Sequence, residues 1–399
     1  MNLSFNNTQN AFAYKSNKDL KLAKFLFSTM RYPLFVPIAT RLTPLLLKIK
    51  MPINGLVRST IFKQFVGGET LQETAEVVDT LNKYDVKVIL DYGVEGKEGE
   101  ANFDTATQQF INVIEYAATQ TNIPFISIKV TGLARFTLLE TLNDAPRIRS
   151  GIHDNELEDA EWERVKDRMY HICDVASQKN IGVLIDAEET WIQDPIDRLA
   201  MELMQTFNKE KAVVYNTIQL YRHDRLDFFK LSHNIAQQNN FILGMKLVRG
   251  AYMEKERQRA NQKRDIDPIQ PNKESTDNDF DASVEYGMNN IDSIAVIIAT
   301  HNEKSNLNAY ELMIQNNIQL NHPHIHFSQL YGMSDNITFN LAKAGCSVSK
   351  YLPFGPINDV IPYLMRRAQE NSSVGEQTGR ELGLIKTELQ RRKKENQPT

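Results

Sequence analysis

Residues 242–249 read Ile242-Leu-Gly-Met-Lys-Leu-Val-Arg249, an apolar run of strand length with polar residues toward its C-terminal end. Seven further runs of this length recur along the chain, at residues 86–91, 125–130, 182–186, 212–219, 295–300, 325–330 and 347–352. Helical patterns lie between them; Trp162, Val165 and Met169, for example, share one helix face. Eight strands, each followed by a helix, predict an α/β fold of the (β/α)8 TIM-like barrel type. A doubly wound sheet is the alternative, because periodicity cannot show closure.

The remaining segments predict additions to this barrel. Thr70 and Glu73 form a capping box at the start of a helix that ends near residue 84. Ser334 is expected to cap another helix, which Gly345 would close. We expect an N-terminal helical arm at residues 1–70, the barrel at 71–375 and a charged helical tail at 376–399. Two long, charged connections, residues 140–164 and 253–284, are expected to be loops of the kind that form lids.

The composition narrows the class of protein. The chain has 399 residues, 41% of them hydrophobic, and a formal net charge of -4. The near-balanced charge predicts no nucleic-acid partner. The two cysteines, Cys173 and Cys346, predict neither a disulfide framework nor a cysteine metal motif. Residues 1–19 lack both the apolar core of a secretory signal and the Arg-rich face of a transit peptide, so we expect a cytoplasmic protein.

One segment suggests that the protein contacts a membrane surface. Residues 32–50 are rich in Leu and Ile and carry Arg41, Lys48 and Lys50. A basic, apolar helix of this kind can lie in a membrane interface, here the inner face of the membrane. The alternative is an arm that packs on the barrel. No stretch of the chain is long and apolar enough to span a bilayer.

Polar residues interrupt the predicted strands mainly at their C-terminal ends, where a (β/α)8 barrel carries its active site. They come from six strands and are Lys129, Asp186, Gln219, Lys246, Arg249, Thr300, His301 and Tyr351. Buried polar residues can be structural, but agreement among six strands favours a catalytic site. The set is rich in cations, which predicts bound anions. A phosphate-bearing cofactor together with a carboxylate substrate would supply them.

A stripe near the C-terminus favours the same kind of substrate. Tyr363, Arg366, Arg367 and Glu370 share one face if residues 362–371 are helical. Arginine offers two parallel donors to a carboxylate, so the stripe fits a small molecule such as an amino acid. A solvated helix face is the alternative.

Other chemistries find little support in the sequence. The chain contains no Gly-x-Gly-x-x-Gly and no P-loop lysine motif. His322, His324 and His326 alternate and would share a strand face, but Pro323 interrupts them and they precede the strand. We therefore expect no metal site.

At these residues the chain resembles the proline dehydrogenase family, in its monofunctional, eukaryotic-like branch. The motifs that carry the resemblance lie at residues 89–95 (Ile-Leu-Asp-Tyr-Gly-Val-Glu), 185–190 (Ile-Asp-Ala-Glu-Glu-Thr), 246–252 (Lys-Leu-Val-Arg-Gly-Ala-Tyr), 299–302 (Ala-Thr-His-Asn), 351–355 (Tyr-Leu-Pro-Phe-Gly) and 363–371 (Tyr-Leu-Met-Arg-Arg-Ala-Gln-Glu-Asn). Asp-Pro-Ile-Gln-Pro at residues 267–271 indicates the branch. The resemblance implies a distorted barrel whose last helix sits over the mouth.

The resemblance also implies roles for individual residues. L-proline would be oxidised by hydride transfer to FAD, and the electrons would pass to a quinone. Asp186 and Lys246 would be catalytic, with Lys246 near flavin N5 and Asp186 hydrogen-bonded to Tyr351. The substrate would contact Lys129, Leu330, Tyr351, Tyr363, Arg366, Arg367 and Glu370. FAD would contact Ala187, Gln219, Arg249, Gly250, Ala251, Thr300 and His301. Two alternatives are another flavin barrel, such as methylenetetrahydrofolate reductase, and a non-catalytic barrel scaffold.

Overall fold

The computed structural model describes residues 3–30, 54–93, 98–144, 156–361, 363–365 and 375–395. The chain divides into two compact units. One combines Met1–Val88 with Gln329–Thr399, and the other is Ile89–Ser328. The predicted division into arm, barrel and tail stays a prediction.

Eight parallel strands form a closed barrel in sequence order, so the (β/α)8 prediction is confirmed and the open sheet is excluded. They are β1 (Lys87–Tyr92), β2 (Phe125–Ile128), β3 (Gly182–Ile185), β4 (Val214–Gln219), β5 (Leu243–Val248), β6 (Ile294–Ala299), β7 (Ile325–Leu330) and β8 (Val348–Phe354). Every residue of β2, β3 and β4 is buried, as expected of parallel strands covered on both faces. The expected placement of the last helix over the mouth falls in part on residues outside the described ranges.

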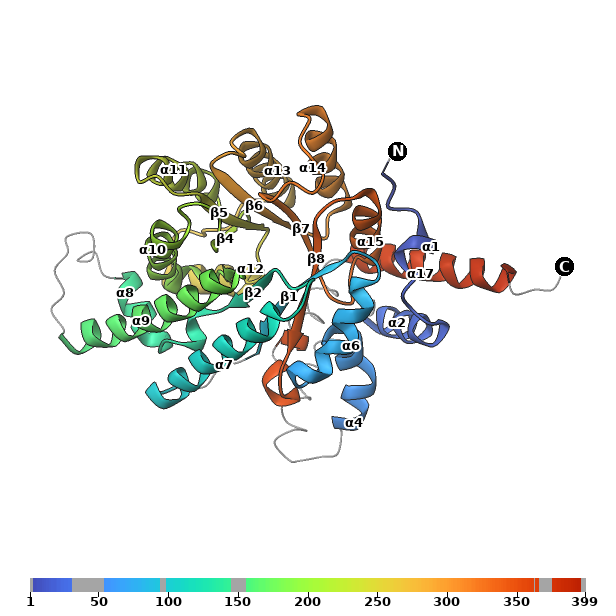
Figure 1. Cartoon of the computed structure of the whole chain (residues 1–399), viewed down its shortest axis with the longest axis horizontal. Helices are drawn as coiled ribbons and strands as arrows, with labels where there is room; N and C mark the ends of the chain where they lie inside the picture. Colours follow the sequence, from blue (N-terminus) through green and yellow to red (C-terminus); the bar gives the residue numbers. More distant parts are fainter. Residues whose placement is uncertain are drawn as a thin grey trace. The chain divides into compact units, whose positions relative to one another are not determined.

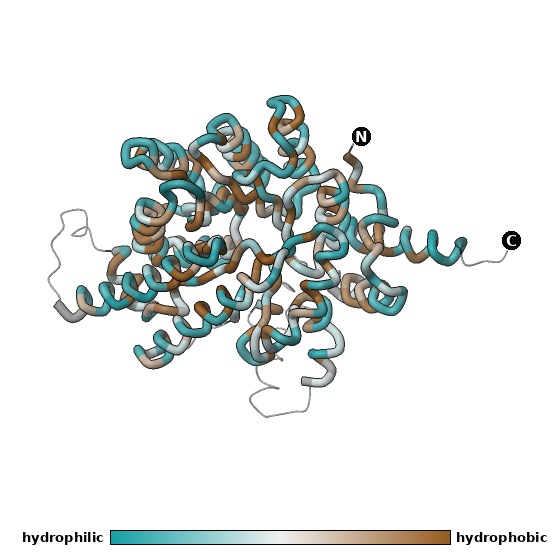
Figure 2. Tube along the Cα trace, in the orientation of Figure 1, coloured by the Kyte–Doolittle hydropathy of each residue, from teal (hydrophilic) through white to brown (hydrophobic). Residues whose placement is uncertain are grey.

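The second unit carries a helix after each of its strands β2 to β6. Its helices are α7 (Glu100–Ala118), α8 (Phe136–Asp144), α9 (Glu156–Lys179), α10 (Thr190–Phe207), α11 (Arg225–Gln238), α12 (Met253–Lys263), α13 (Lys273–Asn289) and α14 (Glu303–Gln315). Figure 1 shows α10, α11, α13 and α14 outside the strands. In Figure 2 the apolar colours gather on the strands, and the outer helices are mostly polar. The strand ends are therefore the place where polar side chains can meet inside this unit.

The first unit has a core of its own. Its helical segments are α1 (Thr8–Ala11), α2 (Asn17–Met30), α4 (Asn54–Val57), the π-helical η1 (Arg58–Phe62), α5 (Lys63–Phe65), α6 (Leu71–Asn82), α15 (Asp335–Ala344) and α17 (Gly375–Glu395). Phe12, Phe27 and Phe65 pack in one cluster with Leu364 and Ile385. Helix α17 lies along α2, and α1 lies along α15 (Figure 1). The two ends of the chain are thus held together by apolar packing.

Two predicted connections contain regular structure. Residues 253–284 are not a loop: they hold α12 and most of α13. In 140–164 the ends belong to α8 and α9, and residues 145–155 lie outside the described ranges. Helix α12 was missed because its sequence has no apolar stripe, the signal on which helix prediction depends.

The expected helix caps are confirmed in part. Thr70 Oγ1 accepts the Glu73 N–H at 3.2 Å, as in a capping box, but the Glu73 carboxylate accepts the N–H of Glu69 instead of Thr70. Gly345 closes α15 with φ at 94°. Ser334 stands at the N-cap of α15 but its side chain caps nothing, so that prediction was wrong. Its backbone is left-handed and its N–H bonds to Glu381.

Candidate active site

Three predicted residues meet at the C-terminal ends of the strands of the second unit. The Asp186 carboxylate accepts a hydrogen bond from Lys129 Nζ at 2.9 Å and forms a close ion pair with Lys246 Nζ. Ser127 Oγ donates to the same carboxylate at 2.7 Å. The Lys246 side chain is 6% exposed and that of Lys129 is 14% exposed. The cluster is therefore a largely buried carboxylate held between two cations.

The strand register explains why these residues meet. Ile128 of β2 pairs with Ile185 of β3, so Lys129 and Asp186 are the next residues of two adjacent parallel strands. Lys246 lies on β5, and its partner on β4 is Thr217. Side chains from alternate strands of a (β/α)8 barrel point inward in the same layer, which lets Lys246 reach Asp186 past β4.

Electrostatics fix the charge of Asp186. Burial alone would raise the pKa of this carboxyl, but Lys129, Lys246 and Ser127 outweigh burial and hold the pKa far below its usual range. Asp186 is therefore a carboxylate at every working pH. Such a group orients cations well but cannot serve as a general base near neutral pH, because it binds protons too weakly.

The residues expected to bind FAD gather on the neighbouring strands. Gln219 ends β4, is 2% exposed, and its Oε1 has no hydrogen-bond partner among the described residues. Gly250 follows β5 with φ at 136°, and a Cβ there would lie 2.4 Å from the Tyr221 ring. This position needs glycine for its backbone and for its close approach to the ring. Ala187 is half-buried beside Asp186, and Ala251 is exposed.

Arg249 is already neutralised by its neighbours. Its guanidinium pairs with Asp277 at 2.7 Å and donates to Thr300 Oγ1 at 2.5 Å and Ser305 Oγ at 3.0 Å. The group also lies 4.4 Å from the centre of the Phe280 ring. Arg249 is thus held rigidly, and its Asp277 partner weakens its attraction for an anion. His301 is half-buried next to Thr300.

The expected substrate walls belong to the first unit. Leu330 ends β7, and Tyr351 lies in β8. The two strands are joined there by a hydrogen bond from the Tyr331 N–H to the Tyr351 carbonyl, at 2.9 Å. Tyr363 is 8% exposed. Arg366, Arg367 and Glu370 lie outside the described residues, so their roles stay predictions.

The histidine run forms no metal site. Only His326 lies within β7, and His322 and His324 precede it with ring centres 5.5 Å apart. His324 Nδ1 lies 2.6 Å from the Ile291 carbonyl oxygen. Within the described ranges no group of three or more His, Cys, Asp or Glu side chains could hold a metal ion.

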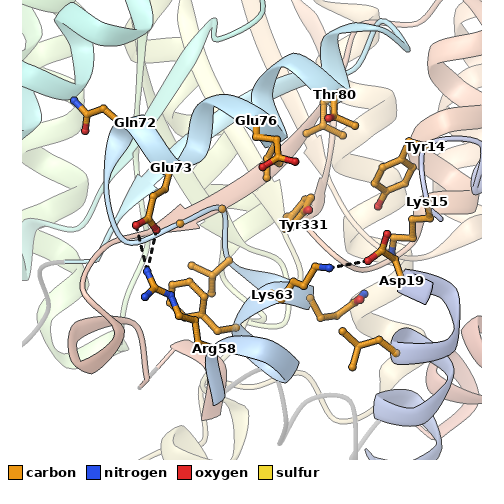
Figure 3. Close-up of a pocket in the computed structure, with 18 residues that line it drawn as sticks. Tyr14, Lys15, Asp19, Arg58, Lys63, Gln72, Glu73, Glu76, Thr80 and Tyr331 are labelled. Carbon is orange, nitrogen blue, oxygen red and sulfur yellow. Dashed lines mark hydrogen bonds and ion pairs between the residues drawn. The ribbon is translucent and has the colours of Figure 1, made fainter. Parts of the chain in front are cut away.

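A hollow of about 560 Å³ in the first unit is a weaker candidate site. Figure 3 shows its charged residues facing one another across the space. Arg58 pairs with Glu73 at 3.2 Å, and Lys63 pairs with Asp19 at 2.9 Å. These charges are satisfied within the hollow, and none of the residues expected to bind substrate or FAD lines it.

Several residues of the site escaped sequence analysis. Ser127 is one, although it alternates with Lys129 along β2 and so points the same way. Glu188 is another: its carboxylate accepts Thr131 Oγ1 at 2.7 Å and links the turn after β3 to the segment after β2. Asp277, the partner of Arg249, lies 28 residues away in the sequence, and no local pattern pairs them.

The fold and this cluster define a class of protein. A closed (β/α)8 barrel with cations converging at the C-terminal strand ends has the architecture of a barrel enzyme. The sequence pattern of the family described as Proline dehydrogenase matches residues 74–380, and the chain belongs to the proline dehydrogenase family.

Individual relatives agree with this assignment. The chain is 33% identical over 339 residues to the Carbapenem antibiotics biosynthesis protein CarD of Pectobacterium carotovorum subsp. carotovorum, covering 85% of this chain and 86% of that protein. It is 31% identical over 384 residues to Proline dehydrogenase 1, mitochondrial, of Dictyostelium discoideum, covering 87% and 67%. The solved structure of proline utilization A (PutA) from Bdellovibrio bacteriovorus, inactivated by N-propargylglycine, matches with a TM-score of 0.70 at 22% identity. That match covers 80% of this chain but 34% of the PutA chain, and it shows the fold alone.

No helix in the described part of the chain is both long and apolar enough to cross a membrane. The segment 32–50 lies outside the described residues, so its proposed contact with a membrane stays a prediction.

Proposed function

We propose that the protein oxidises L-proline to 1-pyrroline-5-carboxylate with FAD, the first step of proline degradation to glutamate. One observation carries the proposal: in a member of this family, two buried ammoniums meet on one carboxylate at the barrel's active-site end. Cations gathered at this end of a barrel can bind an anionic ligand. The carboxylate of an amino acid is a ligand of this kind.

The cofactor residues fit FAD. The buried Gln219 Oε1 lacks a partner among the described residues, and an N–H of a flavin ring would supply one. Gly250 lets the backbone turn against the Tyr221 ring directly after β5, next to the residues that would contact FAD. Thr300 and His301 end the next strand, and Ala187 and Ala251 are small. FAD, when bound, supplies the acceptor for the hydride that leaves C5 of proline.

The chain's own residues would position the substrate. Lys129 would bind the proline carboxylate together with Arg366 and Arg367, and Glu370 would hold the two arginines. Lys246 would stand beside the flavin and donate a hydrogen bond. Asp186 would fix the directions of both lysines, because it keeps its negative charge near neutral pH. Positioning of this kind can supply much of a catalytic rate.

The ring of the substrate would lie between apolar and aromatic walls. Leu330, Tyr351 and Tyr363 would supply them and exclude water from C5. The amine must be neutral when the hydride leaves, and the pKa of Asp186 is held too low for this carboxylate to accept the proton. We therefore propose that the amine loses its proton to solvent before the chemical step.

The electrons would pass to a quinone at a membrane surface. Residues 32–50 of a cytoplasmic protein would make a peripheral contact with the inner face of the membrane. The basic, apolar composition of the segment supports this contact.

The test is turnover with L-proline and a soluble dye as electron acceptor, with chemical identification of 1-pyrroline-5-carboxylate. Lys129→Met should lose most of this activity, because it removes a cation that meets the carboxylate. Lys230→Met is the matched control, since Lys230 is exposed on α11. A wild-type protein that binds FAD but forms no product would contradict the proposal. Equal activity in the two variants would contradict the role of Lys129.

A further inference from the structure

Helix α12 has almost no apolar face. Its sequence is Met-Glu-Lys-Glu-Arg-Gln-Arg-Ala-Asn-Gln-Lys, and its buried residues are Glu256 and Ala260. Met253 is 40% exposed. Burial of apolar surface, which holds most helices in place, therefore contributes little here. An 11-residue helix is also too short to be stable alone. Polar contacts must decide whether α12 stays docked.

One buried carboxylate makes the strongest of these contacts. Glu256 is 2% exposed, and its carboxylate accepts the Thr190 N–H at 2.8 Å and Thr190 Oγ1 at 2.6 Å. Thr190 is the first residue of α10, and the N-cap residue Glu189 makes no side-chain capping bond. Glu256 therefore caps α10 from another helix. A carboxylate at this position also meets the positive end of the α10 dipole.

Contacts made by two solvent-accessible cations of α12 support this cap. Lys255 forms an ion pair with Glu189. The Arg259 guanidinium lies 4.3 Å from the centre of the Trp191 ring, and the same side chain pairs with Glu140 at 2.7 Å. The cations of these contacts keep access to water, since the Lys255 side chain is 57% exposed and that of Arg259 is 29% exposed. Ion pairs screened in this way stabilise little, and cation–π contacts at such sites add modestly. The buried Glu256 carboxylate is thus the contact on which docking of α12 depends most.

Both residues of the Glu256–Thr190 contact follow closely in the chain on residues of the candidate active site. Tyr252 precedes α12, so the helix continues directly from residues 249–251, which are expected to contact FAD. Thr190 lies four residues after Asp186, directly after the turn in which Glu188 accepts a hydrogen bond from Thr131. The Glu256–Thr190 contact therefore joins the segment after β5 to the segment after β3.

We propose that Glu256 is a positioning residue that latches α12 to the N-terminus of α10 and so retains FAD at the end of β5. The inference rests on the proposed FAD-dependent function. When the latch opens, Gly250, Ala251 and Tyr252 lose the support of α12, while Arg249 stays bound to Asp277, and the cofactor gains a route of escape.

The experiment measures how fast cofactor leaves the full-length holoprotein. The protein is loaded with a fluorescent FAD analogue, and excess unlabelled FAD is added to replace it. Glu256→Ala should release FAD roughly 5- to 30-fold faster, the change expected from losing a helix cap. Glu256→Gln should recover much of this loss, because its amide oxygen can still accept the Thr190 N–H. Glu254→Ala is the matched control, since Glu254 is an exposed residue in the first turn of the same helix.

Amide hydrogen exchange of the flavin-free proteins provides a second measurement. In Glu256→Ala alone, the amides of α12 and of the first turn of α10 should exchange faster. Release rates that agree among wild type, Glu256→Ala and Glu254→Ala would overturn the proposal, even if exchange changes. A wild-type protein that takes up no FAD would instead overturn the proposed function. If, in that case, amide exchange in Glu256→Ala also equals that of the wild type, the latch is overturned as well.

Discussion

Replacing Asp186 by Asn tests the cluster most sharply, because the change removes one charge and nearly preserves the shape. The lost carboxylate accepts hydrogen bonds from Ser127 at 2.7 Å and Lys129 at 2.9 Å and pairs with Lys246. The two lysine side chains are only 14% and 6% exposed, so water replaces the carboxylate poorly. The variant thus leaves two neighbouring ammoniums without this counter-charge.

The size of the effect follows from that burial. Removing one partner of a buried ion pair typically lowers stability by about 3–5 kcal/mol. Because Lys129 keeps some access to water, we expect the unfolding free energy of Asp186→Asn to fall by about 3 kcal/mol. Ser127→Ala removes one charge-assisted hydrogen bond but leaves both ion pairs in place, so it should cost less, about 1.5 kcal/mol.

Urea unfolding of the flavin-free proteins at neutral pH measures both variants. The pKa of Asp186 lies below its ordinary value of 3.8, so its stabilising effect is complete above that pH and is lost only in acid. The difference between wild type and Asp186→Asn should therefore be constant around neutral pH and shrink in acid. If Asp186→Asn is no less stable than Ser127→Ala, the carboxylate does not hold the two lysines as we describe.

Three further predictions address other parts of the protein. Arg366→Met should lower kcat/KM for L-proline by roughly 30-fold to several thousand-fold while changing turnover of pyrrolidine little, since pyrrolidine lacks the carboxylate; equal losses would contradict this. Burial and, second, Asp335 raise the pKa of Glu381 to about 7 from its ordinary value of 4.5. The wild type should therefore lose stability as the pH rises from 4.5 to 7, and Glu381→Gln should not; parallel pH curves in urea unfolding would refute this. Deleting residues 32–50 should reduce co-sedimentation with anionic liposomes but leave turnover with a soluble dye, and unchanged liposome binding would argue against the membrane contact.

The fold was largely predictable because its signal is local. Each strand is a short apolar run between helical patterns, and the predicted strand ends differ from the observed ones by at most two residues. The run at residues 125–130, for example, ends as a strand at Ile128, because Val130–Gly132 turns into a 3-10 helix. Closure of the barrel depends on pairing between distant strands, which no periodicity reports.

The sequence predicted which residues gather in the candidate site but not which partners hold them. The strand ends of a barrel meet, so Lys129, Asp186 and Lys246 could be grouped from the sequence. Hydrogen-bond partners from distant parts of the chain could not be predicted, because side-chain geometry decides them. Arg249 is bound to Asp277, for example. Thr190 is capped by Glu256, which lies 66 residues later. The cap expected from Ser334 failed for a similar reason, since Glu381, 47 residues away, takes that N–H.

The most direct test of the proposed activity is the visible spectrum of the FAD-loaded protein when L-proline is added without oxygen. The account predicts that the flavin absorbance bleaches and that one 1-pyrroline-5-carboxylate forms for each flavin reduced. A flavin that dithionite reduces but L-proline leaves unchanged would contradict it.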